Sequence, residues 1–464
     1  MITATFVLFV VFSITAHPEF VEINGLGHSG EEWKSRIIYQ IITDRFDRTD
    51  GRNATCDLRN YCGGTFKGIQ NRLDYIKNLG MNAIWISPVV ANIPNSYHGY
   101  AATDLYSINS HFGSAQELKN LVKACHEKDI WVMVDVVANH VGNTNEDFSK
   151  INPFNKEEYY HKKCIVTDFT NQTELEQCRL YNLPDLDTEN PWVRNQLAEW
   201  TRWLITTFDL DGLRVDTVRH VHKDFWRFYV EAVPTYLMGE VFDERIDYLK
   251  GYAEVMPGQL HYPLYYTLID VFARRNSMYA LRSTLDNMKS SGMDVALLGS
   301  FVSNHDNKRF LNMDGDWNIL KSAYAVILLG ESIPIVYYGD EQGYAGGDDP
   351  NNREPMWGSG WNEAHHLFSF IKKCASARAK IKVNDQLIER YVDDSFFGWS
   401  RGCVFCGVTN KGSWAGDVSR RITSHPFSEG DQLFDLISGA RIAVGPDGFI
   451  CTLKSGCPVI LVKI

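Results

Sequence analysis

The sequence predicts an α/β protein: a (β/α)8 TIM barrel with a small domain inserted after the third strand and an antiparallel β-sandwich at the C-terminus. Three observations predict it. Short apolar runs alternate with amphipathic stretches from residue 37 to about 380, as in repeated strand–helix units. The polar stretch 141–187 interrupts this alternation and is too long for an ordinary loop. After about residue 388, short alternating runs are separated by Gly, Asn and Asp, which is typical of a sandwich.

The barrel strands are predicted from continuous apolar runs, the pattern of parallel strands that are buried on both faces. These runs span 37–42, 83–87, 131–137, 212–215, 237–241, 297–302 and 333–338. Helical periodicity fills gaps between them, for example at 116–127, 192–208 and 318–329. A doubly wound sheet would share the alternation, but no Gly-x-Gly-x-x-Gly follows the first run. Polar residues follow several different strands, which favours a barrel.

The N-terminal residues resemble a signal peptide. An apolar run at 6–14 precedes Ala16, and it is shorter than the ~20 residues that span a bilayer. A buried N-terminal strand is the alternative. No later stretch is apolar enough to cross a membrane, and sequons at Asn53 and Asn171 fit a secretory route. We therefore expect a secreted, extracellular protein, or one in a digestive or lysosomal compartment reached by the same route.

These patterns divide the chain into five segments. They are a signal peptide (1–16), the first part of the barrel (17–140), the inserted domain (141–187), the second part of the barrel (188–388) and the C-terminal β-sandwich (389–464). The 46 basic and 57 acidic residues give a net charge of −11, which excludes nucleic acid as the main partner because phosphate binding needs excess Lys and Arg. The 12 Trp and 22 Tyr suit flat, ring-shaped ligands.

The ten cysteines fall into three groups. Two pairs flank short polar segments and are predicted to form local disulfides in an oxidising compartment. These pairs are Cys56 with Cys62 and Cys164 with Cys178. Cys125 and Cys374 continue apolar helical faces and are predicted to be core residues. The last four leave three pairings open, with zinc binding as a less favoured alternative. They are Cys403, Cys406, Cys451 and Cys457.

Three carboxylates stand at predicted strand ends: Asp216 in Gly-Leu-Arg-Val-Asp, Glu240 in Met-Gly-Glu-Val and Asp306 in Ser-Asn-His-Asp-Asn. Paired carboxylates cleave glycosidic bonds, one acting as an anion and the other as a protonated acid. Arg214 shares a strand face with Asp216 and would keep it ionised, whereas the apolar neighbours of Glu240 suit a protonated acid. Each carboxylate alone could equally be a strand-end salt bridge or a helix cap.

Five motifs carry a resemblance to a known family. They are DVVANH at 135–140, LPDLD at 183–187, GLRVDTVRH at 212–220, GEV at 239–241 and FVSNHD at 301–306. With these motifs in this order, the chain resembles the α-amylases of glycoside hydrolase family 13, and the fungal type most. The resemblance covers the chain up to about residue 380. It implies a secreted enzyme that hydrolyses internal α-1,4-glucosidic bonds of starch, glycogen and related polysaccharides with retention of configuration.

The resemblance also implies roles for residues at matching positions. Asp216 would be the nucleophile, Glu240 the general acid/base and Asp306 the third carboxylate, which holds the distorted sugar. The implied substrate-binding residues are Tyr100, His140, Arg214, Arg219, His220, His305, Asp349 and Arg353. For the histidines the alternative is a satisfied core residue, and for Tyr100 a packing aromatic.

A Ca2+ site is the second implication. Asn139 and Asp185 offer the hard oxygen ligands that Ca2+ prefers. The resemblance adds the backbone carbonyls of Glu176 and His220, so the ion would hold the insert against the barrel. An ordinary polar contact at a domain boundary is the alternative. The expected partner is an α-glucan substrate, with no nucleic acid and no membrane, and the expected state is a monomer.

The chain departs from the fungal pattern at three positions. Ala101 replaces a Trp that would stack on the sugar, Arg219 replaces a Lys, and Ser303 replaces a common Glu. These changes put the product pattern in question rather than the reaction. Three rival functions are an α-glucosidase, a glucanotransferase and an amylase-like binding protein without activity. The last predicts lost carboxylates, and all three are present. The C-terminal segment could bind starch, although a purely stabilising sandwich is favoured.

Overall fold

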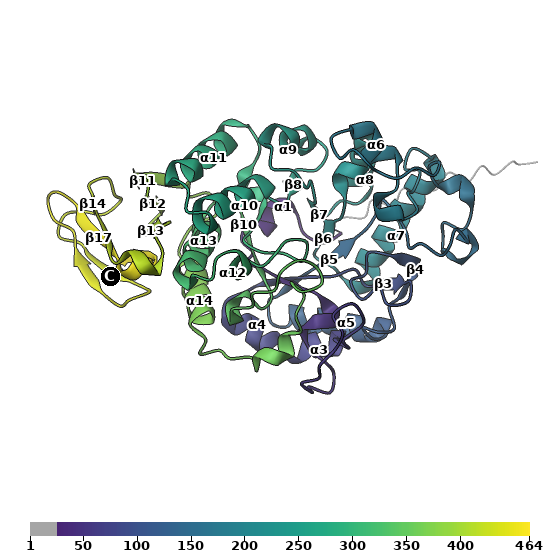
Figure 1. The fold of residues 1–464 in the computed structure, drawn as a ribbon, viewed down its shortest axis with the longest axis horizontal. Helices are drawn as coiled ribbons and strands as arrows, with labels where there is room; N and C mark the ends of the chain where they lie inside the picture. Colours follow the sequence, from purple (N-terminus) through teal and green to yellow (C-terminus); the bar gives the residue numbers. More distant parts are fainter. Residues whose placement is uncertain (1–25) are drawn as a thin grey trace, which may run out of the picture.

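The computed structural model describes residues 26–464, which form a central barrel flanked at opposite ends by the inserted segment and the C-terminal sheets (Figure 1). The predicted signal peptide lies outside the described residues. Among the helices that are described, none is long and apolar enough to cross a membrane. The predicted fold class is confirmed.

Eight parallel strands form the barrel, in the order β8-β7-β6-β5-β2-β1-β10-β9. Their bounds are β1 Ile38–Ile41, β2 Ala83–Ile86, β5 Trp131–Val136, β6 Gly212–Val215, β7 Tyr236–Gly239, β8 Gly258–Gln259, β9 Gly299–Phe301 and β10 Ile333–Tyr337. The two edge strands meet through a parallel bridge between Leu260 and Gly299, and His261 N donates to Gly299 O at 2.8 Å. This contact closes the barrel, so the C-terminal ends of all eight strands face one side.

The seven apolar runs became seven of the eight strands, but β8 was not predicted. It has two residues, Gly258 and Gln259, and so offers no apolar run to detect.

Helices cover the outside of the barrel. Their bounds are α1 Gly30–Trp33, α2 Thr43–Phe46, α3 Phe66–Asn71, α4 Leu73–Leu79, α5 Ala115–His126, α7 Pro191–Phe208, α8 Lys223–Ala232, α9 Ile246–Ala253, α10 Tyr262–Leu268, α11 Met278–Ser290, α12 Phe310–Met313, α13 Trp317–Leu329 and α14 His366–Arg378.

Local sequence sets where these helices begin and end. Ser114 caps α5 and forms a capping box with Glu117, which satisfies backbone groups at the first turn. Asn190 caps α7, Pro191 occupies its first position, and Asp209 ends it in a left-handed conformation. The two predicted helices at 116–127 and 192–208 are therefore confirmed to within one residue at each end.

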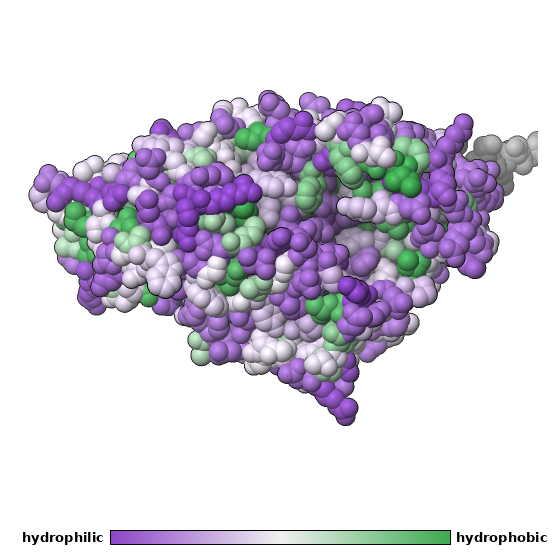
Figure 2. All heavy atoms as spheres, in the orientation of Figure 1, coloured by the Kyte–Doolittle hydropathy of each residue, from purple (hydrophilic) through white to green (hydrophobic). Residues whose placement is uncertain are grey.

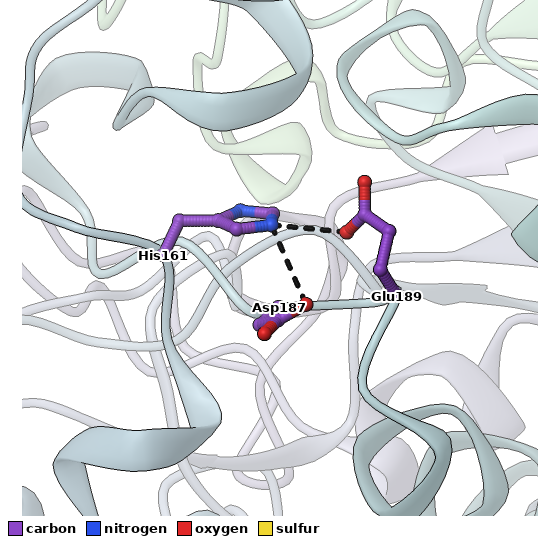
Figure 3. A group of neighbouring side chains, drawn as sticks. All are labelled: His161, Asp187 and Glu189. Carbon is purple, nitrogen blue, oxygen red and sulfur yellow. Dashed lines mark hydrogen bonds and ion pairs between the residues drawn. The ribbon is translucent and has the colours of Figure 1, made fainter.

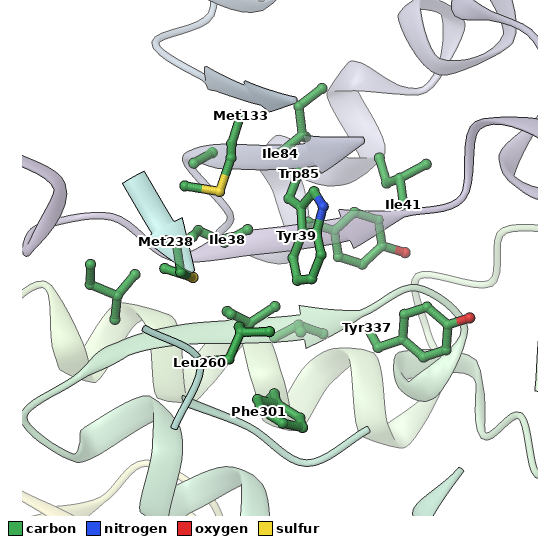
Figure 4. Packing of buried hydrophobic residues seen from close by; sticks show 14 of the residues in the cluster. Ile38, Tyr39, Ile41, Ile84, Trp85, Met133, Met238, Leu260, Phe301 and Tyr337 are labelled. Atoms are coloured by element: carbon green, nitrogen blue, oxygen red, sulfur yellow. The ribbon is translucent and has the colours of Figure 1, made fainter. Parts of the chain in front are cut away.

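Side chains fill the barrel, so its centre is a core rather than a pore. Figure 4 shows part of the packed cluster, on both faces of the barrel strands, and the ten residues labelled in it are at most 1% exposed. They are Ile38, Tyr39, Ile41, Ile84, Trp85, Met133, Met238, Leu260, Phe301 and Tyr337. Gly299 makes room for this packing, because a Cβ there would lie 2.5 Å from the sulfur of Met238.

Two chain segments extend from the barrel near the ends of its strands. The first is the hairpin of β3 (Val90–Asn92) and β4 (Ala102–Ile108), whose connecting loop carries Tyr100. The second follows β5 and is the inserted segment. Its polar sequence shows no clear helical pattern, but α6 (Gln172–Gln177) forms there, and Asn171 caps it by accepting from Glu174 N. The predicted disulfide between Cys164 and Cys178 brackets α6.

The C-terminal segment is antiparallel, as predicted. One sheet has the order β11-β12-β13-β18-β15-β16, and β14 pairs with β17. The bounds are β11 Ile388–Val392, β12 Phe396–Arg401, β13 Val404–Thr409, β14 Val418–Ile422, β15 Gln432–Asp435, β16 Arg441–Ala443, β17 Phe449–Leu453 and β18 Val459–Lys463. Phe396, Phe405, Phe449 and Leu461 form a second core between the two sheets.

The cysteine predictions have mixed outcomes. The disulfide between Cys56 and Cys62 is present, as is the one in the insert, and Cys125 and Cys374 are buried as predicted. The four C-terminal cysteines are unpaired within the described residues, so their pairing stays open. Burial raises the pKa of three of them, Cys406, Cys451 and Cys457, which keeps these thiols protonated at neutral pH.

Candidate active site

Arg214 is the centre of the predicted site. It lies on β6, is fully buried, and its guanidinium faces three carboxylates. Nη1 lies 2.9 Å from Asp135 Oδ1 and 2.7 Å from Asp216 Oδ1, and Nη2 lies 3.0 Å from Glu240 Oε1. The strands β5, β6 and β7 are adjacent in the barrel, so their ends bring these side chains together. The surface is hollowed over this part of the barrel (Figures 1 and 2).

The segments that follow the strands hold the two central carboxylates in place. Asp216 N donates to Val136 O at 2.9 Å, and Glu240 N donates to Val215 O at 2.8 Å. Thr217 has a left-handed backbone with φ 51°, and its N–H donates to Glu240 Oε2 at 3.0 Å. A β-branched residue rarely adopts this conformation, so the packing around it imposes the turn that holds Glu240.

The environments of the two carboxylates separate their pKa values. Burial raises the pKa of Asp216 to about 6, although Arg214 opposes the shift. Burial also raises the pKa of Glu240 to about 8, and the negative charges of Asp216 and Asp306 act in the same direction. At neutral pH the first carboxylate is therefore ionised and the second is protonated, which is the division of labour that glycosidic cleavage requires.

A chain of hydrogen bonds runs from β1 to this centre. Gln40 Nε2 lies 2.7 Å from His305 Nδ1, and His305 Nε2 lies 2.7 Å from the hydroxyl of Tyr100. That hydroxyl donates to Asp135 Oδ2 at 2.7 Å, and Trp85 Nε1 donates to the same oxygen at 3.1 Å. Burial lowers the pKa of His305 to about 3, so its ring is neutral, with Nδ1 accepting and Nε2 donating.

Asp306 lies beside the same ring nitrogen of His305 as the Tyr100 hydroxyl, and its side chain is more exposed than those of Asp216 and Glu240. Its Oδ2 lies 3.3 Å from His305 Nε2, and its Oδ1 lies 3.7 Å from Arg353 Nη2. Burial acts to raise its pKa, but His305 and Arg353 outweigh that effect and lower it. Arg353 also pairs with Asp349 at 3.1 Å and reaches the hydroxyl of Tyr97 at 3.2 Å. These residues extend the polar lining away from Arg214.

The residues expected to bind a metal also converge. His140 Nε2 donates to Tyr100 O at 3.0 Å, so the neutral ring accepts at Nδ1, where Asn139 Nδ2 donates at 3.1 Å. Burial lowers the pKa of His140 to about 4, which keeps the ring neutral. This fixes the amide oxygen of Asn139 toward two other oxygens, His220 O at 2.8 Å and Asp185 Oδ1 at 3.3 Å. Three oxygens facing each other without a donor fit a hard cation.

The fourth expected ligand, Glu176, belongs to α6, which packs against the 3-10 turn Val218–His220. Its side chain accepts from Gln172 Nε2 at 2.7 Å. A backbone carbonyl from this helix would therefore come from the insert, whereas His220 belongs to the barrel. The oxygens of these residues fit a cation that is held between the insert and the barrel.

A second group near the insert is an ion-pair cluster. Figure 3 shows His161 between Asp187 and Glu189, with its Nε2 3.6 Å and 2.9 Å from their oxygens. Its Nδ1 lies 2.6 Å from Asp185 Oδ2. Burial alone would lower the pKa of His161, but Asp185 and Glu189 raise it to about 10. A protonated imidazole cannot bind a metal, so His161 is itself the cation that orients Asp185.

Arg219 and His220 follow Asp216 in the same turn. His220 is buried, and burial lowers its pKa to about 3. Arg219 is largely enclosed, with its side chain 11% exposed. Its guanidinium donates to Phe242 O at 2.5 Å and to Phe169 O at 2.7 Å. The structure thus places both residues beside the carboxylates, but it turns the Arg219 side chain toward backbone oxygens.

Two of the three departures from the fungal pattern lie beneath the site. Ala101 is buried and its N–H donates to Asn92 Oδ1 at 2.7 Å. The oxygen of Ser303 accepts from Phe310 N at 3.2 Å, so this buried hydroxyl supports the loop behind Asp306.

The chain is similar to known proteins over most of its length. The family model described as alpha amylase, catalytic domain, matches residues 40–391. An α-amylase of Saccharomycopsis fibuligera is 37% identical, covering 94% of this chain and 92% of the relative, and α-amylase 2 of Schwanniomyces occidentalis is 39% identical, covering 96% and 93%. Among solved structures, an α-amylase from Malbranchea cinnamomea has a TM-score of 0.91 at 36% identity, covering 94% of this chain and 97% of that one.

A second solved structure, an α-amylase from Geobacillus thermoleovorans in complex with acarbose, has a TM-score of 0.84 at 31% identity, covering 93% and 99%. The barrel, its carboxylates and these likenesses define a glycoside hydrolase with a (β/α)8 catalytic domain. More narrowly, the chain belongs to the α-amylase family, as the motifs predicted.

Sequence reasoning missed several supporting residues. Gln40 lies on β1 and Trp85 on β2, and they touch the site because the order of the strands in the sheet brings them beside His305 and Asp135. Asp135 was noticed in a motif but was assigned no role, although it bonds both Arg214 and Tyr100. Its position one residue before the end of β5 was the available signal. Tyr97, three residues before Tyr100, carried no signal of its own.

Proposed function

We propose that this protein is an extracellular α-amylase that cleaves internal α-1,4-glucosidic bonds of starch and glycogen with retention of anomeric configuration. One observation carries the proposal. A single buried guanidinium, that of Arg214, holds Asp216 and Glu240 on neighbouring strands, and their pKa values are raised to about 6 and about 8. Closely spaced carboxylates of unequal acidity suit a retaining double displacement.

In the first step, the ionised Asp216 attacks the anomeric carbon while Glu240 donates its proton to the departing glycosidic oxygen. The bond from carbon to that oxygen breaks, and an ester to Asp216 forms. Arg214 bonds Asp216 Oδ1 and keeps this carboxylate anionic and oriented. The N–H of Thr217 fixes Glu240, so the acid stays within reach of the leaving oxygen.

In the second step, Glu240 is ionised and takes a proton from water, whose oxygen attacks the same carbon and releases Asp216. Two inversions retain the α-configuration. The proposed substrate contacts surround the two carboxylates. Asp306, His140 and His305 bind sugar hydroxyls, and Tyr100 stacks on the sugar ring. Asp349 and Arg353, which pair with each other, would bind the next sugar, and Arg219 and His220 would lie on the leaving-group side.

We further propose that Ca2+ binds to Asn139, Asp185, the carbonyl of His220 and the carbonyl of Glu176. The three converging oxygens support this ligand set. Bound there, the ion supplies a hard positive charge that the oxygens share. The protein residues do the rest: Asn139 and His220 belong to the barrel and Glu176 and Asp185 to the insert, so the site joins the two segments beside the cleft.

The same proposal includes the domain boundaries after residues 16, 140, 187 and 388. It also includes a monomeric state and secretion. The exposed sequons Asn53 and Asn171 support a secretory route. An extracellular enzyme meets polymeric substrate directly, which suits an open cleft.

One digestion tests the proposed function. Maltoheptaose is incubated with the enzyme, and proton NMR follows the anomeric signals in the first minutes. We expect α-anomeric products of several lengths, and a loss of turnover of at least about a thousandfold in Asp216→Asn and Glu240→Gln. A β-anomeric first product would reject retention, a single terminal glucose product would indicate an α-glucosidase, and products longer than the substrate or cyclic products would indicate a glucanotransferase.

A further inference from the structure

The side chain of Arg219 donates hydrogen bonds to two segments that are far apart in the sequence. Nη1 donates to Phe242 O at 2.5 Å, in the segment after β7, and Nη2 donates to Phe169 O at 2.7 Å, in the insert. Asp243 balances the charge with an oxygen 3.8 Å from Nη1. Since the side chain is 11% exposed, the fork is enclosed and engaged on backbone oxygens rather than presented to the cleft.

The backbone of the same residue binds the insert a second time. Gln172, at the start of α6, donates from Nε2 to Arg219 O at 3.0 Å. The same amide reaches the hydroxyl of Tyr252 at 3.1 Å, and the hydroxyl of Tyr248 donates to its oxygen. Both tyrosines belong to α9, so Gln172 joins the insert to the segments after both β6 and β7.

These contacts form one clasp, which we define as Arg219, Gln172, Phe169 and Phe242. Arg219 lies three residues after Asp216, and Phe242 lies two residues after Glu240. The clasp therefore ties the insert to the two chain segments that carry the proposed nucleophile and acid. Arginine suits this position because its planar fork can donate to two carbonyls at once, whereas a lysine is a single point charge.

We propose that Arg219 is a positioning residue: it clasps the insert against the barrel and thereby sets how the glucan is held on the leaving-group side, without touching the sugar. This inference rests on the proposed function and refines it, because the residue at this position was expected to bind the sugar directly. For the guanidinium to bind a sugar hydroxyl, it would have to release a carbonyl that it now satisfies.

The direct-contact role and the clasp role predict different variants. Arg219→Lys keeps a positive donor that can reach a sugar, but a single ammonium nitrogen replaces the two separate nitrogens that donate to the two carbonyls. Gln172→Ala leaves Arg219 and the sequon at Asn171 intact, and it removes the bond to Arg219 O together with the bonds of the same amide to Tyr252, Tyr248 and Glu176. Arg245→Lys is the matched control, because Arg245 also pairs with Asp243 and lies over Tyr248, but it makes no hydrogen bond to the described part of the insert.

The main readout is the cleavage pattern of maltoheptaose labelled at its reducing end. We expect Arg219→Lys and Gln172→Ala to lower, by about three- to tenfold, the frequency of cuts that place two or more sugars on the leaving-group side. The double variant should change the pattern no more than the stronger single variant, because both act on one clasp. Arg245→Lys should keep the wild-type pattern.

A second readout measures the insert itself. Limited proteolysis and amide hydrogen exchange over residues 165–178 should show faster cleavage and exchange in both clasp variants and not in Arg245→Lys. An aryl maltotrioside, whose leaving group occupies only the first position, should be hydrolysed by Gln172→Ala and Arg245→Lys with a kcat/KM within twofold of wild type. Failure of the wild-type enzyme to hydrolyse either substrate would refute the proposed function instead, and so separates the two proposals.

Two results would overturn the clasp. A wild-type cleavage pattern in Gln172→Ala, together with unchanged exchange over 165–178, would show that the insert is not held through Arg219. A pattern that changes in Arg219 variants alone, with no change in exchange, would show direct binding of the sugar. If Arg219→Lys does not fold, Gln172→Ala decides between the same outcomes.

Discussion

Arg214 and Asp216 are joined by a 2.7 Å contact between Nη1 and Oδ1, although both belong to one short strand and its end. The arginine is fully buried and shares the same guanidinium with Asp135 and Glu240. One positive charge thus serves three carboxylates. If Arg214 is replaced, the three buried carboxylates lose the guanidinium that compensates their charge. We therefore expect substitution at this position to affect the site more than substitution elsewhere in it.

Arg214→Lys should therefore remove activity while keeping the charge. A lysine ammonium cannot bond Asp135, Asp216 and Glu240 together, so the carboxylates lose their mutual orientation. We expect kcat to fall by a factor on the order of 100 or more, with little change in the far-ultraviolet circular dichroism. The measurement is kcat on soluble starch, with Arg282→Lys on the exposed face of α11 as the control. Wild-type kcat in Arg214→Lys would contradict the assignment.

The pH profile of kcat/KM should be bell-shaped. The acidic limb should follow the ionisation of Asp216 near 6 and the alkaline limb the loss of the proton from Glu240 near 8, with the two behaving as a coupled pair. The negative charge of Asp306 raises both pKa values. Asp306→Asn removes that charge, so both limbs of its residual activity should move to lower pH. A shift to higher pH would reject this electrostatic account.

Tyr100→Phe tests the hydrogen-bond chain. The ring stays for stacking, but Asp135 and His305 lose a common partner at 2.7 Å. We expect kcat/KM to fall about tenfold, and the free energy of unfolding to fall by about 1–3 kcal/mol because buried groups are left unpaired. Tyr106→Phe on β4 is the matched control, since its hydroxyl has no hydrogen-bond partner among the described residues. Equal effects of the two changes would argue against the chain.

Removal of calcium should lower the melting temperature. A ligand that binds only the folded protein stabilises it by about 2.7 kcal/mol at a hundredfold excess over Kd. We expect chelation to lower the wild-type transition by several degrees and to leave Asp185→Asn almost unaffected. Glu189→Gln, which changes an acid outside the proposed ligand set, should keep the calcium-dependent difference. An unchanged wild-type transition after chelation would reject the site.

Much of the fold could be predicted because it depends on local patterns. Continuous apolar runs marked seven barrel strands, and helical periodicity marked α5, α7 and α13. The strand β8 could not be predicted, because two residues are too few to carry a period. The hairpin of β3 and β4 also escaped, since its bulged pairing breaks the alternation of a regular strand.

The sequence by itself determined which chemistry the chain carries: the three carboxylates, Arg214, and the family to which their motifs belong. Only the tertiary structure decided which groups touch. Gln40 meets His305, Trp85 meets Asp135, and Arg219 turns from the cleft to two carbonyls. The physical reason is that the barrel sets strands and loops side by side that are separated in the chain, and such contacts leave no local pattern in the sequence.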